Sequence, residues 1–463
     1  MKKTILILIA LAILGIVTLG IINLMVGIPV PASYASIPAT TPEMEQAKAI
    51  IGTKCQMCHS HDPGVPFYAK MPAASAMIGK HVQMGTEMSD LQQLLTDNGE
   101  DEVALAKLEQ SIKLDTMPIL PFLAMHWNGK LKASEKQALL AWIHQVRAAK
   151  YSTGLASTEF ESNPVQPLPD AWPGGVTAAK AKLGNRLYHD VRLSGDDTIS
   201  CASCHDLKKG GTDHAQFSTG VRNQIGGINA PTSFNAMFNV LQFWDGRATD
   251  LADQAGGPPL NPIEMDTNWE QVIEKLTKDA ELTKLYEAVF GTSQWNDQNI
   301  KDAIAEFEKT LITPNSALDK YLKGDSDALT EAEQMGFALF NEHSCVTCHA
   351  GKAMGGQSFE KPVDPKAYYA FRGIDPGEAE FGRFNATKDE ADRYKLKVPL
   401  LRNIAVTGPY LHDGNITDLK EIVPIMNNHF VPKLNRKPLS DDEVDMIVSM
   451  LIKNSGRLNG EPI

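Results

Sequence analysis

Cys201-Ala202-Ser203-Cys204-His205 is the stretch that decides the fold, because its pattern, Cys-X-X-Cys-His, occurs three times in the chain. The other copies are CQMCH at 55–59 and CVTCH at 345–349, and together the three motifs contain all six cysteines. Two cysteines at this spacing add to the vinyl groups of a haem, and the histidine that follows binds the iron. The sequence therefore predicts three covalently bound c-type haems, numbered here one to three in chain order. Their predicted attachment and proximal residues are Cys55, Cys58 and His59; Cys201, Cys204 and His205; and Cys345, Cys348 and His349.

Other uses of paired cysteines explain this pattern less well. A zinc site would need two more ligands near each pair, and the three motifs already use all the cysteines. A redox dithiol does not require a histidine after it in three separate copies. Zinc sites, redox dithiols and a disulfide framework are therefore weaker interpretations than haem attachment.

Length and charge limit the architecture and the partners. A chain of 463 residues suggests about three domains, and the three motifs are almost evenly spaced, so we expect one haem per domain. The formal net charge is −12, and the Lys and Arg residues are not clustered. This charge pattern argues against nucleic acid as a partner.

The N-terminus predicts a membrane anchor over residues 1–30. Lys2 and Lys3 precede an uncharged apolar run from Ile5 to about Val30, which is long enough to cross a bilayer. The positive end should stay in the cytoplasm, so the haem domains should lie in the periplasm and the chain should cross the inner membrane once. The alternative is a cleaved signal peptide with its cleavage region at 32–39, although the apolar run is longer than such peptides need.

Two segments rich in proline divide the remainder. Residues 31–43 are rich in Pro, Ala, Ser and Thr, and residues 161–175 contain four prolines and a glycine pair, so both read as linkers. They leave a monohaem cytochrome c domain at 44–160 and a larger part at 176–463. That part holds a domain for haem two at 176–325 and a domain for haem three at 326–463, which should pack together.

The expected fold class is mainly α: three cytochrome c-like haem domains in tandem after an N-terminal transmembrane helix. Capping boxes at 134–137 and 440–443 each precede apolar residues at helical spacing. A third amphipathic run covers 300–311 and ends before Pro314. Helices after the distal loops would close each domain over its haem.

The sixth iron ligands distinguish the haems, because an iron with an open face can bind a small molecule. For haem one we predict Met117, which precedes Pro118 and the helix that follows; the competing methionines are Met71, Met77 and Met125. For haem three we predict Met426 rather than Met354, because Met354 is too close to His349 in the chain to reach the opposite face.

Haem two lacks an equivalent Met-Pro pair before a closing helix. His214 is the only histidine between its motif and His343, and Met237 and Met265 are the nearby methionines. This iron is therefore the candidate for an open, reactive site.

Residues 176–463 resemble the bacterial dihaem cytochrome c peroxidases, and the extra haem domain and anchor make the chain similar to the membrane-bound trihaem peroxidases that use quinol. The shared motifs, in chain order, are Cys201–His205, Asn229-Ala230-Pro231-Thr232, Phe243-Trp244-Asp245-Gly246-Arg247, Gln254-Ala255, Glu264-Met265, Cys345–His349, Leu401-Arg402-Asn403 and Thr407-Gly408-Pro409-Tyr410-Leu411-His412-Asp413-Gly414.

The resemblance implies roles for individual residues. Haem two would be the peroxidatic haem, with Glu264 as the acid–base carboxylate and Gln254 as its neighbour. Trp244 would lie between haems two and three, and haem three would transfer electrons. A calcium ion would bind Asn229, Thr407 and Pro409, two of them through backbone carbonyls.

One position departs from the family pattern. Many members place a histidine on the resting peroxidatic iron, but Val221 occupies the matching position here and cannot bind iron. We therefore expect haem two to be open at rest; the alternative is ligation by His214.

The predicted reaction reduces hydrogen peroxide with two electrons and two protons to two waters, with the periplasm as its compartment. The donor would be quinol, which the anchor would bring close to haem one, or a small soluble cytochrome or cupredoxin. Two other functions stay open: a pure electron-transfer cytochrome, and a related enzyme that oxidises tryptophans of a partner protein. The second would place a tyrosine, for which Tyr410 is the nearby candidate, where Met426 is predicted.

Overall fold

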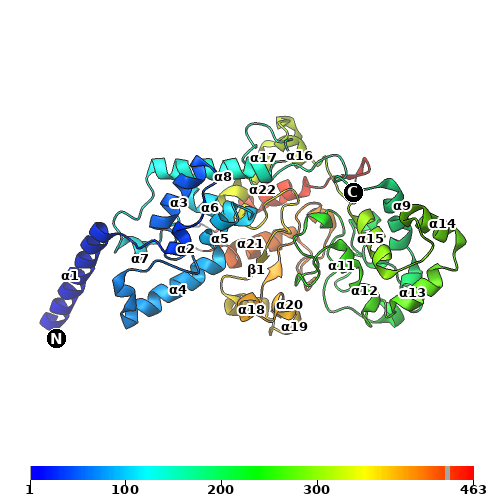
Figure 1. Cartoon of the computed structure of the whole chain (residues 1–463), viewed down its shortest axis with the longest axis horizontal. Helices are drawn as coiled ribbons and strands as arrows, with labels where there is room; N and C mark the ends of the chain where they lie inside the picture. Colours follow the sequence, from blue (N-terminus) through cyan, green and yellow to red (C-terminus); the bar gives the residue numbers. More distant parts are fainter. Residues whose placement is uncertain (1, 433–437, 463) are drawn as a thin grey trace. The chain divides into compact units, whose positions relative to one another are not determined.

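The computed structural model describes residues 2–432 and 438–462 and divides into two compact units, Met1–Ser152 and Thr153–Ile463. Both units are mainly helical, which confirms the predicted class (Figure 1). The α-helices of unit 1 are α1 (Lys2–Val26), α2 (Ala32–Ala35), α3 (Pro42–Lys54), α4 (Pro72–Met88), α5 (Leu91–Thr96), α6 (Glu102–Lys113), α7 (Leu120–Leu123) and α8 (Ala133–Lys150).

Unit 2 contains the haem two and haem three motifs in one compact body. Its α-helices are α9 (Ala178–Tyr188), α10 (Cys201–Cys204), α11 (Leu251–Ala255), α12 (Gly257–Leu260), α13 (Trp269–Leu276), α14 (Ala280–Phe290), α15 (Asp297–Glu308), α16 (Ala317–Leu322), α17 (Glu331–Glu342), α18 (Pro365–Arg372), α19 (Glu378–Phe381), α20 (Phe384–Thr387), α21 (Leu419–His429) and α22 (Asp441–Ile452). Two short antiparallel pairs complete it, β1 (Phe359–Glu360) with β2 (Leu396–Lys397) and β3 (Arg457–Leu458) with β4 (Glu461–Pro462).

Helix α8 supplies the core of unit 1. Leu139, Trp142 and Ile143 are fully buried on one face of it, which packs against α3 and α6. The predicted capping box at 134–137 is wrong in register, because the helix begins at Ala133. The residue that caps the helix is Lys132. The carboxylate of Glu135, the third residue of the helix, accepts a hydrogen bond from the backbone N–H of Lys132 at 2.7 Å, as in a capping box.

Helix α1 begins at Lys2 and carries exposed apolar side chains such as Ile9 and Ile13 over its first half. Within the part of the chain that the structure describes, no helix is both long enough and apolar enough to cross a membrane. The predicted transmembrane anchor is therefore not confirmed.

Two helix pairs build the cores of unit 2. Helices α9 and α15 lie side by side and bury Leu183, Leu187 and Ile304 next to the haem two motif. The predicted run over 300–311 is helical to Glu308, and the chain beyond that residue continues into the same core. Helices α17 and α22 form the second pair, beside the haem three motif.

Helix α22 starts as the sequence predicts. The hydroxyl of Ser440 accepts from the backbone N–H of Glu443, and the carboxylate of Glu443 accepts from the backbone N–H of Ser440 at 2.8 Å. This reciprocal cap satisfies two of the donors that a helix start leaves free.

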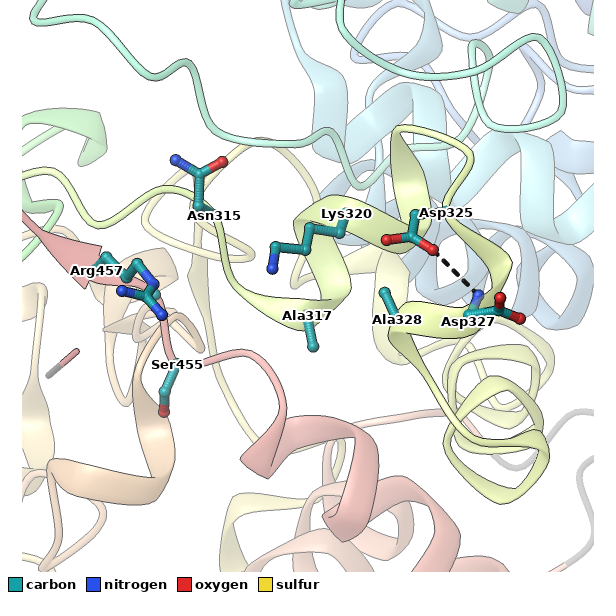
Figure 2. A pocket seen from close by; sticks show the side chains of 9 residues that line it. Asn315, Ala317, Lys320, Asp325, Asp327, Ala328, Ser455 and Arg457 are labelled. Atoms are coloured by element: carbon teal, nitrogen blue, oxygen red, sulfur yellow. Dashed lines mark hydrogen bonds between the residues drawn. The ribbon is translucent and has the colours of Figure 1, made fainter. Parts of the chain in front are cut away.

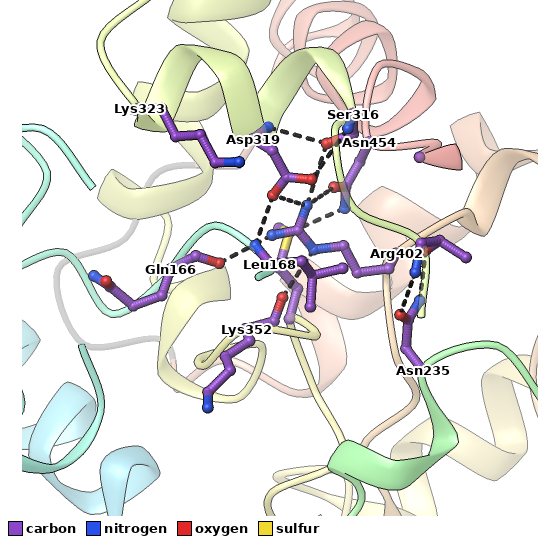
Figure 3. Close-up of polar contacts among 12 residues, drawn as sticks. Gln166, Leu168, Asn235, Ser316, Asp319, Lys323, Lys352, Arg402 and Asn454 are labelled. Atoms are coloured by element: carbon purple, nitrogen blue, oxygen red, sulfur yellow. Dashed lines mark hydrogen bonds and ion pairs between the residues drawn. The ribbon is translucent and has the colours of Figure 1, made fainter. Parts of the chain in front are cut away.

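Arg402 connects distant segments of unit 2 from a fully buried position (Figure 3). Its guanidinium lies 2.7 Å from the carboxylate of Asp319 in α16, and both side chains have 0% exposure. It also donates to the carbonyls of Gln166 and Lys352 and to the side chain of Asn454, at 2.8–3.0 Å. The segment predicted as a second linker, 161–175, is thus held against unit 2 at Gln166.

Replacing Arg402 by leucine should lower the free energy of unfolding by about 3–5 kcal/mol, because Asp319 would stay buried without its cation. Chemical denaturation followed by circular dichroism measures this loss. The control, Lys278→Leu, removes an exposed pair with Glu274 and should change stability much less. Equal losses in the two variants would contradict a central role for Arg402.

Candidate active site

Two of the predicted proximal histidines are oriented as metal ligands usually are. The Nδ1 atom of His59 lies 3.0 Å from the carbonyl of Ser89, and that of His349 lies 3.1 Å from the carbonyl of Met354. A hydrogen bond from Nδ1 fixes the ring and leaves Nε2 available to a metal. Burial lowers the pKa of His349 to about 4, so its imidazole is neutral, the form that binds iron.

The backbone of His205 is fixed by a hydrogen bond from a buried tyrosine. The hydroxyl of Tyr188 donates to its carbonyl at 2.8 Å, and burial lowers the pKa of its imidazole. The preceding motif forms the short helix α10, which sets Cys201 and Cys204 one turn apart.

The cysteines do not resemble reactive dithiols. Burial raises the pKa of Cys55 and of Cys201 to about 12, and that of Cys204 to about 11. Redox-active cysteines instead have lowered pKa values, since the thiolate is the reactive form. Buried thiols next to an oriented, neutral histidine fit covalent haem attachment.

Glu264 lies beside the position where the family histidine is replaced. The backbone N–H of Val221, a fully buried residue, donates to the carbonyl of Glu264 at 2.8 Å. Burial raises the pKa of the Glu264 carboxyl, which accepts a hydrogen bond from the amide of Asn261 at 2.6 Å. Burial is the largest cause of the raised pKa of the Cys204 thiol, and the charges of Asp213 and Glu264 raise it further. Met265, the next residue, lies in the hydrophobic cluster against which Cys201 packs, so this segment adjoins the haem two motif. Asn261 is a site residue that no sequence motif marked.

His214 is directed elsewhere. It is exposed, and its Nε2 atom lies 3.0 Å from the carbonyl of Val406. Gln254 is half-buried on α11, between the Trp244 loop and Glu264 in the chain.

Trp244 is held at the centre of a polar cluster. Its indole N–H donates to the carbonyl of Asn229 at 2.9 Å, and its ring packs edge-on against His412 with centroids 6.3 Å apart. The backbone N–H of Asn229 donates to the carbonyl of His412 at 2.8 Å. The structure thus joins Asn229 to the loop that carries Thr407 and Pro409.

The amide of Asn229 has a defined orientation. Its nitrogen donates to the carbonyls of Ala215 and Gln216 at 3.0 and 3.2 Å, which leaves its oxygen as the atom that can bind a cation. An amide oxygen beside a loop rich in carbonyls suits calcium chemically.

The two methionine candidates for haem three differ in their surroundings. Met354 is fully buried, and its sulfur accepts a hydrogen bond from the amide of Asn454 at 3.0 Å. Met426 is half-buried on α21, next to Tyr368 and Tyr369. The engaged sulfur of Met354 favours Met426 as the ligand, which stays a prediction.

Next to Cys58, unit 1 contains a small cavity of about 20 Å³ that Met117 does not line. Its walls include Met77 and Met125, two of the competing methionines, together with His126. His126 is buried, stacks on Phe122 with ring centroids 4.2 Å apart, and bonds the hydroxyl of Tyr68 at 2.9 Å. Sequence analysis missed His126, although it directly follows Met125.

A larger cavity of about 350 Å³ opens in unit 2 away from all the predicted site residues (Figure 2). Its polar groups serve local structure; for example, the carboxylate of Asp325 accepts from the backbone N–H of Asp327 at 3.2 Å. We assign no chemistry to it.

The fold and these sites define a helical c-type cytochrome that carries a partly buried carboxyl on a segment next to one haem motif. A model of the di-haem cytochrome c peroxidase family matches residues 178–327, and a haem-binding domain model matches residues 17–145. The chain is 44% identical over 407 residues to cytochrome c peroxidase Ccp of Escherichia coli, covering 87% of this chain and 85% of that protein. The chain therefore belongs to the di-haem cytochrome c peroxidase family and is an oxidoreductase of the peroxidase type.

Further relatives agree with this assignment. Cytochrome c551 peroxidase of Nitrosomonas europaea is 42% identical over 290 residues, which cover 63% of this chain and 83% of that protein. Among solved structures, a MauG-like protein associated with microbial copper homeostasis matches with a TM-score of 0.54 and 27% identity, covering 62% of this chain and 94% of that one.

Replacing Asn261 by leucine should raise the pKa of Glu264 further, because the donor that stabilises its charged form is lost. Glu264 would then become protonated at a higher pH than in the unchanged protein. The acidic limb of the pH profile of kcat/KM for peroxidase activity should therefore move to higher pH. Profiles of Asn261→Leu and of the control Asn385→Leu, whose amide bonds a backbone carbonyl, measure this. An unmoved limb would contradict the role of Asn261.

Proposed function

We propose that this protein reduces hydrogen peroxide to water at haem two, with electrons that pass through haems one and three. The observation that carries the proposal is the partly buried carboxyl of Glu264, on a segment whose backbone bonds Val221 and whose next residue, Met265, packs in the same cluster as Cys201. Val221 cannot bind iron, so the sixth coordination position of haem two would stay free for peroxide. The carboxyl of Glu264 could then transfer a proton at that position.

Haem two, when bound, supplies an iron that binds peroxide and delivers two electrons to its O–O bond. The Glu264 carboxylate takes a proton from the nearer peroxide oxygen and returns it to the farther one, so that water leaves. Gln254 orients the peroxide and stabilises the charge that separates. One peroxide, two electrons and two protons from solvent give two waters.

The remaining assignments name what would hold the other cofactors. Haem one would bind Cys55, Cys58 and His59 with Met117 as its sixth ligand, and haem three would bind Cys345, Cys348 and His349 with Met426. Trp244 would lie on the electron route into haem two. The oxygen of Asn229 and the carbonyls of Thr407 and Pro409 would hold calcium, which would fix the loop beside Trp244.

We propose that haem two is open in the resting oxidised protein. The support is that Val221 is fully buried and bonded to Glu264, while His214 bonds the carbonyl of Val406. A high-spin signal in the fully oxidised spectrum is the expected result. A purely low-spin spectrum that gains a high-spin haem only after partial reduction would instead support ligation by His214.

We propose a periplasmic location, with residues 1–30 holding the chain at the inner membrane. The support is the uncharged run from Ile5 to about Val30 and the exposed apolar side chains on the first half of α1. The second half of this helix contacts the region of haem one: Leu19 packs in the same cluster as Met57 and Cys58. Quinol, which is confined to the bilayer, would then reach haem one directly.

Glu264→Gln should keep all its haems and lower peroxidase turnover by about 10²-fold or more, because glutamine cannot accept the proton. Stopped-flow turnover with peroxide, with haem content measured by pyridine haemochrome, tests this. Glu270→Gln, a change at an exposed carboxyl on α13, is the matched control. Near-normal turnover in Glu264→Gln would refute its role.

Charging the exposed part of α1 should separate the two kinds of donor. The double variant Ile9→Glu, Ile13→Glu leaves Leu19 in place but opposes insertion into a bilayer. We expect it to lose about tenfold or more of quinol-driven peroxide turnover in liposomes and to keep turnover with reduced soluble cytochrome c. Leucine at both positions is the control. Equal quinol activity in the charged and control variants would argue for a soluble donor.

A further inference from the structure

Around Trp244, the buried side chains of Lys397 and His412 and the partly exposed side chain of Arg383 have incomplete hydrogen bonding. Lys397 is 6% exposed, and its ammonium donates to the carbonyl of Leu241 at 3.2 Å. An ammonium group has three N–H donors, and a buried charge normally needs an opposite charge beside it. Burial lowers the pKa of Lys397 to about 7, and the charge of Asp245 acts in the opposite direction.

Arg383 approaches the same loop from the other side of Phe359. Phe359 pairs with Lys397 across β1 and β2, and the Arg383 guanidinium stacks on its ring at 4.3 Å. A Cβ atom on Gly246 would lie 2.6 Å from Nη1 of Arg383, so the guanidinium closely approaches the Trp244–Gly246 turn. Among the described residues this buried Nη1 has no hydrogen-bond acceptor, and Nε lies 3.5 Å from Asp392.

His412 completes the set on the face of Trp244. It is 4% exposed, and its Nε2 atom has no hydrogen-bond partner among the described residues; the carboxylate of Glu380 is 3.7 Å away. Buried polar atoms in folded proteins are almost always paired. Three such groups around one tryptophan, on a loop between two haem motifs, indicate an acidic ligand that the chain itself does not supply.

We propose that Lys397, Arg383 and His412 bind the propionate carboxylates of a haem in unit 2, next to Trp244. The inference rests on the proposed attachment of haems two and three, whose propionates would bring further carboxylates into this unit beside those of Asp245, Asp392 and Glu380. An ammonium and a guanidinium are the groups that satisfy a buried carboxylate. Trp244 then lies against the propionate edge of a haem, and the three side chains act as positioning residues for electron transfer.

The test is the reduction potential of each haem, measured by spectroelectrochemical titration of the full haem-loaded protein. Lys397→Met leaves a propionate anion uncompensated, which favours ferric over ferrous iron. We expect the equilibrium of one haem with a reference dye to shift at least tenfold toward the oxidised form, about 59 mV for one electron. The haem that shifts, high-spin haem two or low-spin haem three, identifies which propionate is bound.

Arg383→Met, at a partly exposed side chain, should shift the same haem in the same direction, and Lys397→Arg should restore most of the potential. Lys278→Met, an exposed lysine on the same unit, is the control and should change nothing. The proposal is overturned if, for both haems of unit 2, the equilibrium with the dye in Arg383→Met and in folded Lys397→Met differs from that of the unchanged protein by less than twofold. Peroxidase activity is measured separately. A variant that loses activity while both potentials stay unchanged would contradict the propionate site but not the proposed peroxidase function.

Discussion

The guanidinium of Arg402 is the interaction on which unit 2 depends. It lies among four segments that are far apart in the sequence: the chain near Gln166, helix α16 at Asp319, the loop after the haem three motif at Lys352, and the C-terminal segment at Asn454. A fully buried arginine costs much desolvation energy, so it is stable only with all its acceptors in place. The four segments around Arg402, among them the loop after the haem three motif, therefore stabilise one another.

A second cluster of contacts, around Trp244, joins the segment after the haem two motif to the segment after the haem three motif. Asn229, from the segment after the haem two motif, bonds both Trp244 and the backbone of His412, which comes from the segment after the haem three motif. Because the tryptophan is held by backbone groups from both sides, its position relative to the two motifs is set by the fold of unit 2. Such a fixed aromatic ring suits electron transfer, which depends steeply on geometry.

The three haem motifs differ in what the chain places around them. After the haem two motif in the chain, Val221 contributes a buried hydrocarbon side chain and a backbone hydrogen bond to Glu264. Near haem three, the sulfur of Met354 is already engaged by Asn454. Beside Cys58, buried His126 and Tyr68 form a polar pair that sequence analysis did not foresee. The surroundings of similar motifs thus differ through contacts with residues far along the chain, such as Glu264, Asn454 and His126.

The sequence by itself determined the haem chemistry, the helical class and the family, because covalent attachment needs a local motif and helix caps such as Ser440 act within one turn. The local pattern erred even at short range at the start of α8, where the helix is capped at Lys132 rather than at Ser134. Only the tertiary structure decided that Asn261 bonds Glu264, that His214 bonds Val406, and that Lys397, Arg383 and His412 surround Trp244. Except for the bond between Asn261 and Glu264, which are three residues apart, these contacts join loops across long stretches of chain. Burial, which no local pattern encodes, makes their polar groups require partners.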